Sequence, residues 1–383
     1  MIERPYYLNQ LLRAKDTDFI KIITGIRRSG KSTLLEMLKK HLLTQGVPEN
    51  HVIHISYEQI PWFPLEKAET LYAYIKEHIT EPAHRYYLLI DEVQELEEWA
   101  KVINGLKATF PLDIYITGSN SRLFSGEYLT YITGRYIEIK VYPLSLSEFM
   151  TFRGYDESNV AKAFNEYLTI GSFPAAAVAK DPELTEIINS GLFDSIFARD
   201  IIIRGGIRNE GVFLKAAKFI MENIGNPLSV SAISRMLKSQ GSSASADTID
   251  NYLTQMVNAY VLYQCERYDI RGKERLRTNG KYYAADLGLR NRLIGYRRGN
   301  LPRTPSPRLY HFHRPLQFAG GGLCRAERHR HPLLPGVALG HGRNRACPRT
   351  CAVPENHRQF SQVPHYHGHH RFLTEWHHPP ESL

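Results

Sequence analysis

The most informative chemical pattern of the sequence spans nine residues near the N-terminus. Residues 25–33 read Gly-Ile-Arg-Arg-Ser-Gly-Lys-Ser-Thr, so two glycines five positions apart are followed by a lysine and two hydroxyl side chains. Glycine allows the backbone to curl until successive N–H groups point inward at an anion. Lys31 then offers a cation to the β- and γ-phosphates of a nucleotide, and the Ser32 hydroxyl offers a ligand to Mg²⁺.

The sequence around these residues agrees with a loop that binds ATP and Mg²⁺. Residues 19–24 form a short apolar and β-branched run that is typical of a buried strand. After the loop, leucine and methionine recur at helical spacing from Leu34 to Leu42. A helix N-terminus favours anions because its free N–H groups have no partner within the helix. We prefer ATP binding to a chance glycine-rich turn, and the residues expected at the nucleotide are Gly25, Ile26, Arg27, Arg28, Ser29, Gly30, Lys31, Ser32 and Thr33.

Two acidic residues follow the third expected strand. A second strand is expected at 52–57 and a third at 86–90, and Asp91 and Glu92 come directly after the third. Asp91 is expected to hold Mg²⁺ together with Ser32, and Glu92 to orient and deprotonate the attacking water. An acidic helix start is the alternative, because three more glutamates follow within six residues. The phosphate loop upstream favours the catalytic interpretation.

Polar residues also end the fourth expected strand and precede the fifth. Residues 113–117 lead into Ser119 and Asn120, either of which could sense the γ-phosphate or position water. Capping of the next helix is the alternative. Arg135 precedes the strand at 136–141 and could neutralise transition-state charge as an arginine finger does. A structural arginine paired with a surface carboxylate fits the sequence equally well.

The ordered set of these segments resembles a known family. It comprises residues 25–33, Leu-Leu-Ile-Asp-Glu-Val-Gln (88–94), Ile-Thr-Gly-Ser-Asn-Ser-Arg-Leu (116–123), Thr-Gly-Arg-Tyr (133–136) and Val-Tyr-Pro-Leu-Ser-Leu-Ser-Glu-Phe (141–149). The chain is similar to the prokaryotic AAA+ superfamily ATPases that carry a C-terminal domain of unknown function. Residues 167–174 resemble a Gly-Gly-Phe-Pro segment of that family, with Ser172 in place of a glycine, and residues 198–204 resemble another segment.

The resemblance implies an α/β fold with a parallel sheet of order 5-1-4-3-2, flanked by helices. It carries the nucleotide roles onto Lys31 and Ser32, the acidic roles onto Asp91 and Glu92, a sensor onto residues 119–120 and a finger onto Arg135. A finger that acts on a neighbouring copy would require self-association. The family usually ends in a nuclease-like α/β domain, of which residues 301–383 show no pattern.

Residues 210–296 have the pattern of a winged-helix-like domain. Helices are expected around Phe213 to Ile220, at 229–237 after a capping serine, and at 245–253, followed by strands at 260–268 and 281–285. DNA binding through residues 229–281 is one interpretation, with Thr248, Asp250 and Asn251 near the groove. The phosphate contacts would then be Arg271, Lys273, Arg275 and Arg277. A packing or partner-binding module is the alternative, since Asp247 and Asp250 would repel phosphate.

Composition changes abruptly after Asn300. Residues 301–383 contain 12 of the 17 histidines, 11 of the 21 prolines and 11 arginines, but no lysine, aspartate, isoleucine or methionine. No helical or strand period is present. A metal-binding tail fits poorly, because the spacing of His365, His367, His369, Cys347 and Cys351 matches no zinc pattern. A disordered basic tail remains open. We favour a segment translated out of frame.

The remaining bulk properties set limits on the function. The net charge is +9, of which only +2 belongs to residues 1–300, so no global basic field points to nucleic acid. No run approaches the length of a membrane span, no secretory signal is evident, and Cys265 is the one cysteine before residue 301. These features predict a cytoplasmic protein without membrane contact.

The expected domains are an ATPase core at 1–150, a helical connector at 151–209, the winged-helix-like domain at 210–296 and the irregular tail at 301–383. The predicted function is Mg²⁺-dependent hydrolysis of ATP to ADP and phosphate, coupled to a conformational change. A nucleotide-gated DNA-binding or regulatory protein with little turnover is the alternative. A kinase is a weaker one, because no acceptor site is evident.

Overall fold

The structure of the protein, a computed structural model, describes residues 2–121, 132, 134–269 and 274–296, with the backbone alone at 267–269 and 274–279. The interpretations of residues 301–383, including the histidine cluster and the reading-frame hypothesis, lie outside the described residues. Arg271 and Lys273 of the predicted wing lie outside them too.

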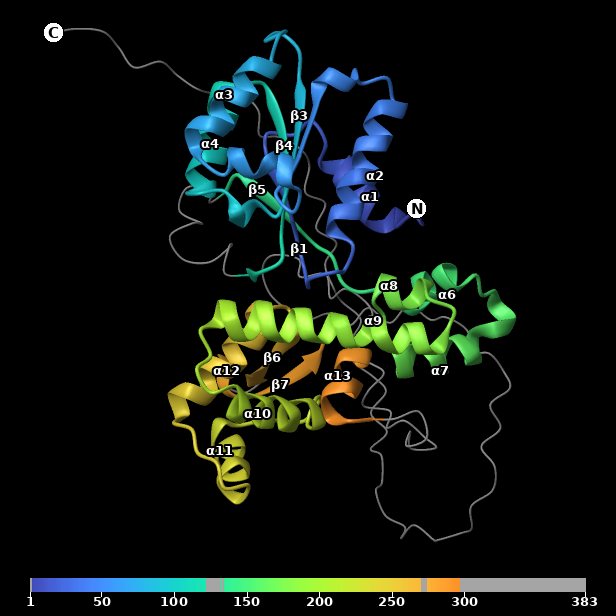
Figure 1. The fold of residues 1–383 in the computed structure, drawn as a ribbon, viewed down its shortest axis with the longest axis vertical. Coiled ribbons are helices and arrows are strands. Elements are labelled where there is room, and N and C mark those ends of the chain that lie inside the picture. Colours follow the sequence, from blue (N-terminus) through green and yellow to red (C-terminus); the bar gives the residue numbers. More distant parts are fainter. Residues whose placement is uncertain (1, 122–131, 133, 270–273, 297–383) are drawn as a thin grey trace, which may run out of the picture. The chain divides into compact units, whose positions relative to one another are not determined.

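Five parallel strands form the central sheet (Figure 1). Their order is β2-β3-β4-β1-β5, which is the predicted order 5-1-4-3-2 read from the other edge. Each strand falls on one of the short apolar runs expected from the sequence, so the predicted fold class is confirmed. The strands are β1 (Ile20–Thr24), β2 (Val52–Ser56), β3 (Tyr86–Asp91), β4 (Leu112–Gly118) and β5 (Tyr136–Lys140).

Helices cover both faces of the sheet because its strands are apolar on both sides. Ile20 and Ile22 pack in one core with α3 and α4, whereas Ile23 packs in a second core with α1 and α2. Successive side chains of a strand point to opposite faces, which explains this division. Figure 1 shows the two helix pairs on either side of the sheet. They are α1 (Pro5–Ala14) and α2 (Lys31–Thr44), and α3 (Ala68–His78) and α4 (Trp99–Thr109).

The predicted site residues lie together at the carboxyl ends of three adjacent strands. β1, β3 and β4 are adjacent and parallel, with Ile22 opposite Ile116 and Ile90 opposite Ile116 in the register. Residues 25–33 follow β1, Asp91 ends β3, and Ser119 follows β4. Among the described residues of this part, short 3₁₀ helices lie in the connections, namely η1 (Glu49–His51), η2 (Ile60–Leu65) and η3 (Val93–Glu95).

The chain after β5 is mainly helical. Its first segments are α6 (Leu146–Arg153), η5 (Glu157–Asn159), α7 (Val160–Ile170), α8 (Pro174–Val178), α9 (Pro182–Asp194) and the π-helical η6 (Ser195–Ile203). Helices α10 (Glu210–Glu222), α11 (Val230–Ser239) and α12 (Ala246–Asn258) follow, and α13 (Leu287–Ile294) ends the described chain. Ser229 caps α11 through its side chain, as the sequence predicted, and Ser245 caps α12 in the same way.

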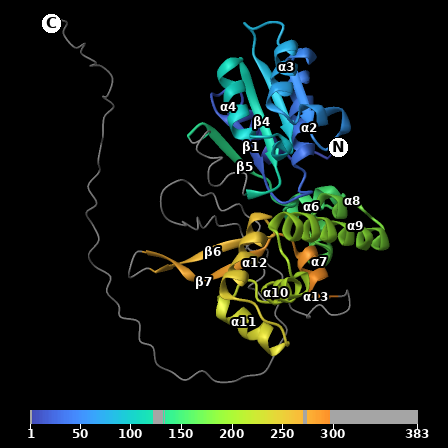
Figure 2. The same cartoon turned by 60° about the vertical axis from the view of Figure 1, so that its left-hand side comes forward.

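An antiparallel hairpin follows α12 (Figure 2). It consists of β6 (Leu262–Asp269) and β7 (Glu274–Ala284). Pro227, in the segment before α11, forms an additional bridge with Lys281 of β7. Helix, helix and hairpin therefore occur in the order that the winged-helix prediction requires.

One hydrophobic core joins the helical segments to the phosphate loop. It contains Phe197 and Ile201 of η6, Phe213 of α10 and Tyr252 of α12, together with Ile26 from the loop. The segments at 151–209 and 210–296 thus share a core, and a loop residue packs into it. None of the helices within the described residues has the length and apolar character needed to cross a membrane.

Candidate functional site

Gly25 and Gly30 hold the loop in backbone conformations that other residues rarely adopt. The φ angle is +137° at Gly25 and +99° at Gly30. A Cβ atom at Gly25 would lie 2.1 Å from the carbonyl oxygen of Val141, which follows β5. Gly30 is the N-cap residue of α2, so the unpaired N–H groups of the first helical turn are available to an anion at the end of the loop.

Lys31 lies inside the loop. Its Nζ donates to the carbonyl oxygens of Gly25 at 3.1 Å and Ile26 at 3.2 Å. Burial lowers the pKa of the Lys31 ammonium, and attraction to Glu92 and Asp91 opposes that shift. The sequence-predicted cation and both predicted carboxylates therefore act on one another in the folded chain.

Ser32 and Asp91 line the same cavity, which has a volume of about 360 Å³. The Asp91 carboxylate accepts a hydrogen bond from the Thr117 hydroxyl at 2.6 Å and one from Ser56 at 3.4 Å. Hydroxyl and carboxylate oxygens are the ligands that Mg²⁺ takes from proteins, with substrate phosphates and water completing its shell. These two residues therefore fit the magnesium role, and within the described residues no cluster of three or more His, Cys, Asp or Glu offers a rival site.

Glu92 is buried and held by three polar partners. Its N–H donates to Thr117 Oγ1 at 2.9 Å, and its carboxylate accepts from Ser119 Oγ at 3.1 Å and from Gln94 Nε2. Its φ is +55°, a left-handed conformation uncommon for a residue with a side chain. Burial would raise the pKa of Glu92, but attraction to Lys31 and the Gln94 hydrogen bond outweigh it, so the pKa lies below its ordinary value. Glu92 is thus a carboxylate at neutral pH.

Two buried donors of the loop have no partner among the described residues. They are the Ser29 hydroxyl and Nε of Arg27. Buried polar groups are ordinarily hydrogen-bonded, and each unpaired one carries a free-energy cost of about 1–3 kcal/mol. Donors of this kind within an anion-binding loop fit the oxygens of a triphosphate.

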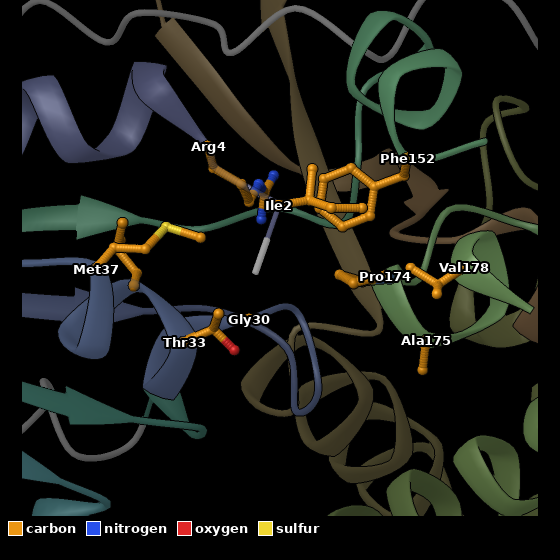
Figure 3. Close-up of a pocket in the computed structure, with 10 residues that line it drawn as sticks. Ile2, Arg4, Gly30, Thr33, Met37, Phe152, Pro174, Ala175 and Val178 are labelled. Carbon is orange, nitrogen blue, oxygen red and sulfur yellow. The ribbon is translucent and has the colours of Figure 1, made fainter. Parts of the chain in front are cut away.

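A second, largely apolar cavity of about 470 Å³ adjoins the N-terminus of α2 (Figure 3). Residues of the N-terminal segment, of α2, of α6 and of α8 surround the space, including Ile2, Met37, Phe152 and Pro174. Thr33 lines both this cavity and the polar one that contains Asp91. The two cavities therefore share a lining residue at the end of the phosphate loop, and their volumes fall in the range of small-molecule sites.

Arg4 fastens the loop from outside. Its guanidinium donates to the Ser29 carbonyl at 2.9 Å and to the Tyr142 carbonyl at 3.0 Å, and it pairs with Glu148 at 2.8 Å. A guanidinium offers five donors in a fixed fork, which suits this bridging role. The segment before α1 thereby stabilises both the loop and the wall of the apolar cavity.

Of the two predicted sensor residues, Ser119 contacts the carboxylate of Glu92. Asn120 follows directly and is half-buried. The Ser119 Oγ that donates to Glu92 also accepts a hydrogen bond from Arg204 at 3.4 Å. Arg204 in turn pairs with Glu95 at 3.2 Å. An arginine from the helical part therefore reaches the residues around Glu92.

Arg135 is not brought to this site within one copy of the chain. Its carbonyl accepts from the N–H of Ile20, the first residue of β1, whereas the phosphate loop follows the last residue, Thr24. Five strand residues span about 16 Å. The Arg135 side chain instead donates to Asn104 of α4 at 3.3 Å in an exposed position.

The residues expected at DNA are only partly described. On α12, Thr248 is half-buried, whereas Asp247, Asp250 and Asn251 are exposed. Asn251 accepts from Gln255 at 2.7 Å. The side chains of Arg275 and Arg277 lie outside the described residues, as do Arg271 and Lys273 entirely. The exposed side of α12 carries two carboxylates, which repel a phosphate backbone.

Sequence reasoning missed several residues of the site. Thr117 was passed over as an interior strand residue, although its place two positions before Ser119 puts it at the edge that holds Asp91. Arg4, Asp200 and Arg204 lie far from the loop in sequence, so no spacing rule connects them to it. Their charge within otherwise apolar segments, as in 196–204, was the available signal.

Comparisons with known proteins identify the family of the chain. Residues 17–150 match the AAA domain family, and residues 161–299 match a domain of unknown function, DUF8612. An uncharacterized protein of Haemophilus influenzae is 41% identical over 302 residues, which cover 78% of this chain and 75% of that protein. An uncharacterized protein of Methanocaldococcus jannaschii is 27% identical over 269 residues, which cover 66% and 58%.

Among solved structures, a Walker-type ATPase of Pyrococcus abyssi is similar with a TM-score of 0.48 and 16% identity, covering 76% of this chain and 96% of that one. The strand order and the two consecutive domain matches describe the same architecture. The chain is also 41% identical to a relative of which it covers three quarters. The chain therefore belongs to the P-loop AAA+ ATPases that carry a C-terminal domain of unknown function.

Proposed function

We propose that the protein binds ATP with Mg²⁺ and hydrolyses it to ADP and phosphate, and that nucleotide state changes the conformation of the helical part. The observation that carries this proposal is the convergence of Lys31, Ser32, Asp91 and Glu92 at one edge of the sheet. Asp91 and Ser32 share a cavity, and both carboxylates act on the Lys31 ammonium.

In the proposed complex the triphosphate lies along the loop from Gly25 to Thr33. Loop N–H groups, the Ser29 hydroxyl and Nε of Arg27 bind phosphate oxygens. Lys31 exchanges its two carbonyl partners for the β- and γ-phosphates. The base and ribose occupy the apolar cavity beside Ile2, Phe152 and Pro174. Ser32 and Asp91 would hold Mg²⁺, and the ion would neutralise charge on the phosphates.

Glu92 acts in this proposal chiefly by orientation. A carboxylate whose pKa lies below its ordinary value is a weak proton acceptor, but it accepts a hydrogen bond from water well. Ser119 and Gln94 fix the carboxylate, and Thr117 fixes its backbone. The oriented water attacks the γ-phosphorus and passes a proton to Glu92, while the bond from the γ-phosphorus to the bridging oxygen breaks and ADP leaves.

A role for Arg135 in this reaction requires a second copy of the chain. Its place at the amino end of β1 puts it about a strand length away from the loop of its own copy. The Arg135 guanidinium is exposed at the amino ends of the strands, where it can approach the phosphates bound to a second copy of the chain. Self-association is therefore part of the arginine-finger proposal.

Phosphate release in steady state tests the function. We expect Mg²⁺-dependent turnover by the wild type and loss of ATP binding in Lys31→Ala, whereas Lys40→Ala, which changes an exposed lysine of the same helix, should match the wild type. Glu92→Gln should keep ATP binding and lose turnover by about 10²-fold or more. Wild-type turnover in Glu92→Gln would remove Glu92 from the mechanism. Equal ATP affinity of Lys31→Ala and wild type would refute the nucleotide site.

A further inference from the structure

A chain of five polar side chains links the phosphate loop to the helical part. Asp200 of η6 pairs with Arg27 of the loop at 3.7 Å and with Arg204 at 3.0 Å. Arg204 donates to Ser119, and Ser119 donates to Glu92. The two guanidiniums thus share one carboxylate, and the chain begins and ends on residues that face the expected phosphates.

The carboxylate between them is weakly stabilised. Asp200 is only 3% exposed, and burial raises its pKa above the ordinary value in spite of the attraction from Arg27 and Arg204. Neither arginine depends on Asp200 alone, because each has a second carboxylate partner. Arg27 contacts Glu58 at 3.3 Å and keeps its buried Nε unpaired among the described residues, and Arg204 contacts Glu95. A γ-phosphate carries more charge than one carboxylate and accepts more hydrogen bonds, so it is a stronger partner for the same guanidiniums.

We propose that Asp200 and Arg204 form a γ-phosphate-responsive switch, in which the γ-phosphate displaces Asp200 from the two arginines and Arg204 becomes a phosphate ligand supplied by the same copy of the chain. This inference rests on the proposed function, since it presupposes a triphosphate at the loop. Arg204 differs from Arg135 in that it already lies one side chain away from Glu92.

The position of the pair explains how the switch reaches the rest of the helical part. Ile196, Phe197 and Ile201 of η6 are buried in the shared core. The Phe197 ring lies 6.3 Å from that of Phe213 on α10, which is 5.3 Å from that of Tyr252 on α12. Cores are densely packed, so a shift of η6 moves its neighbours. Rearrangement of Asp200 and Arg204 is thereby communicated to α10 and α12.

The test compares the binding of a non-hydrolysable ATP analogue and of ADP, each with Mg²⁺, to the full chain by titration calorimetry. We expect Arg204→Ala to weaken analogue binding about tenfold or more, the effect of one charge-assisted contact of about 1.4 kcal/mol, and to leave ADP affinity within about twofold. Arg208→Ala, which changes an exposed arginine four residues later, is the matched control and should change neither.

The variant Asp200→Asn distinguishes a γ-phosphate-responsive role of Asp200 from a purely structural ion pair. Without the competing carboxylate, analogue affinity should rise several-fold while ADP affinity stays the same. Arg204→Gln keeps most of the side chain's packing and should reproduce the loss of Arg204→Ala, and Arg204→Lys should restore part of it. Hydrogen exchange in residues 195–203 should respond to the analogue in the wild type and not in Arg204→Gln.

Equal weakening of both nucleotides by the Arg204 variants overturns the switch, as does weaker analogue binding in Asp200→Asn. These outcomes leave the proposed function intact provided that Lys31→Ala still abolishes binding to both nucleotides. If the wild type binds neither nucleotide, or Lys31→Ala binds as the wild type does, the proposed function itself fails and the switch falls with it.

Discussion

The hydroxyl of Thr117 donates a 2.6 Å hydrogen bond to the carboxylate of Asp91. The same oxygen accepts the backbone N–H of Glu92 at 2.9 Å, so one β4 side chain fixes both acidic residues at the end of β3. Both contacts are buried. The two carboxylates therefore depend for their positions on a neighbouring strand and not only on their own.

Removal of the Thr117 hydroxyl should impair turnover more than nucleotide binding. Thr117→Val keeps the shape but loses both hydrogen bonds, and we expect kcat to fall about 10–100-fold, the usual effect of losing a partner that orients a metal ligand. Thr117→Ser retains the hydroxyl and should keep most of the activity. Steady-state phosphate release against Mg²⁺ concentration measures both variants, and equal kcat for Thr117→Val and wild type would contradict this role.

A side chain at Gly25 should destabilise the fold. Gly25→Ala would bring a Cβ to 2.1 Å from Val141 O at a φ of +137°, and strain and overpacking together should lower the free energy of unfolding by about 2–3 kcal/mol. Gly105→Ala in the exposed face of α4 meets no atom within 4 Å and should raise it by about 0.5–1 kcal/mol. Denaturant titration compares the two, and destabilisation by both or by neither would count against the argument.

The Arg4–Glu148 ion pair should make stability depend on pH. Burial acts to raise the pKa of Glu148, but the hydrogen bond from Arg4 and the charge of Arg4 lower this pKa below its ordinary value. A depressed folded-state pKa contributes stability above the unfolded pKa, and the contribution is lost as pH falls through the folded value. Glu148→Gln should therefore cost about 1–2 kcal/mol at pH 7, with the difference from wild type shrinking below pH 4.5.

Unfolding curves from pH 7 down to pH 3 measure this difference. Glu157→Gln, at an exposed position of η5, serves as the control and should follow the wild type throughout. A Glu148→Gln deficit that persists unchanged at low pH would show that the ionised pair is not its source.

Arg135 and Glu92 should complement each other between copies. If Arg135 acts on a neighbour, Arg135→Ala and Glu92→Gln are each inactive alone, but a mixture pairs an intact Arg135 with an intact Glu92 in part of the interfaces. We expect the mixture to recover a measurable fraction of wild-type turnover. Arg85→Ala, which changes another arginine near the amino ends of the strands, is the control and should stay active alone. No recovery at any mixing ratio would count against action in trans.

The wing arginines should carry any DNA affinity that the chain has. Simultaneous replacement of Arg271, Arg275 and Arg277 by alanine should weaken duplex binding at low salt and reduce its salt dependence, since each phosphate contact releases counterions. Fluorescence anisotropy with a labelled duplex measures both. Unchanged affinity would remove DNA from the list of partners, in agreement with the carboxylates Asp247 and Asp250 on α12.

The sequence by itself determined the strands and the loop, whereas the order of the strands in the sheet followed from the resemblance to a known family. The apolar runs that became β1 to β5 are short and β-branched, and the spacing of Gly25, Gly30, Lys31 and Ser32 is a local property of the chain, so neither needed long-range information. The capping serine of α11 was likewise predicted because a cap acts on its own helix, whereas the cap of α12 by Ser245 was found only in the structure.

Only the tertiary structure decided which distant residues complete the site. Arg135 satisfied a sequence pattern yet lies at the opposite end of β1, because a residue that precedes a parallel strand cannot share an edge with one that follows it. Asp200 and Arg204 satisfied no spacing rule, yet η6 carries them to Arg27 and Ser119. Strand direction and helix packing set the distances of these three residues from the site. Neither can be read from the spacing of residues along the chain.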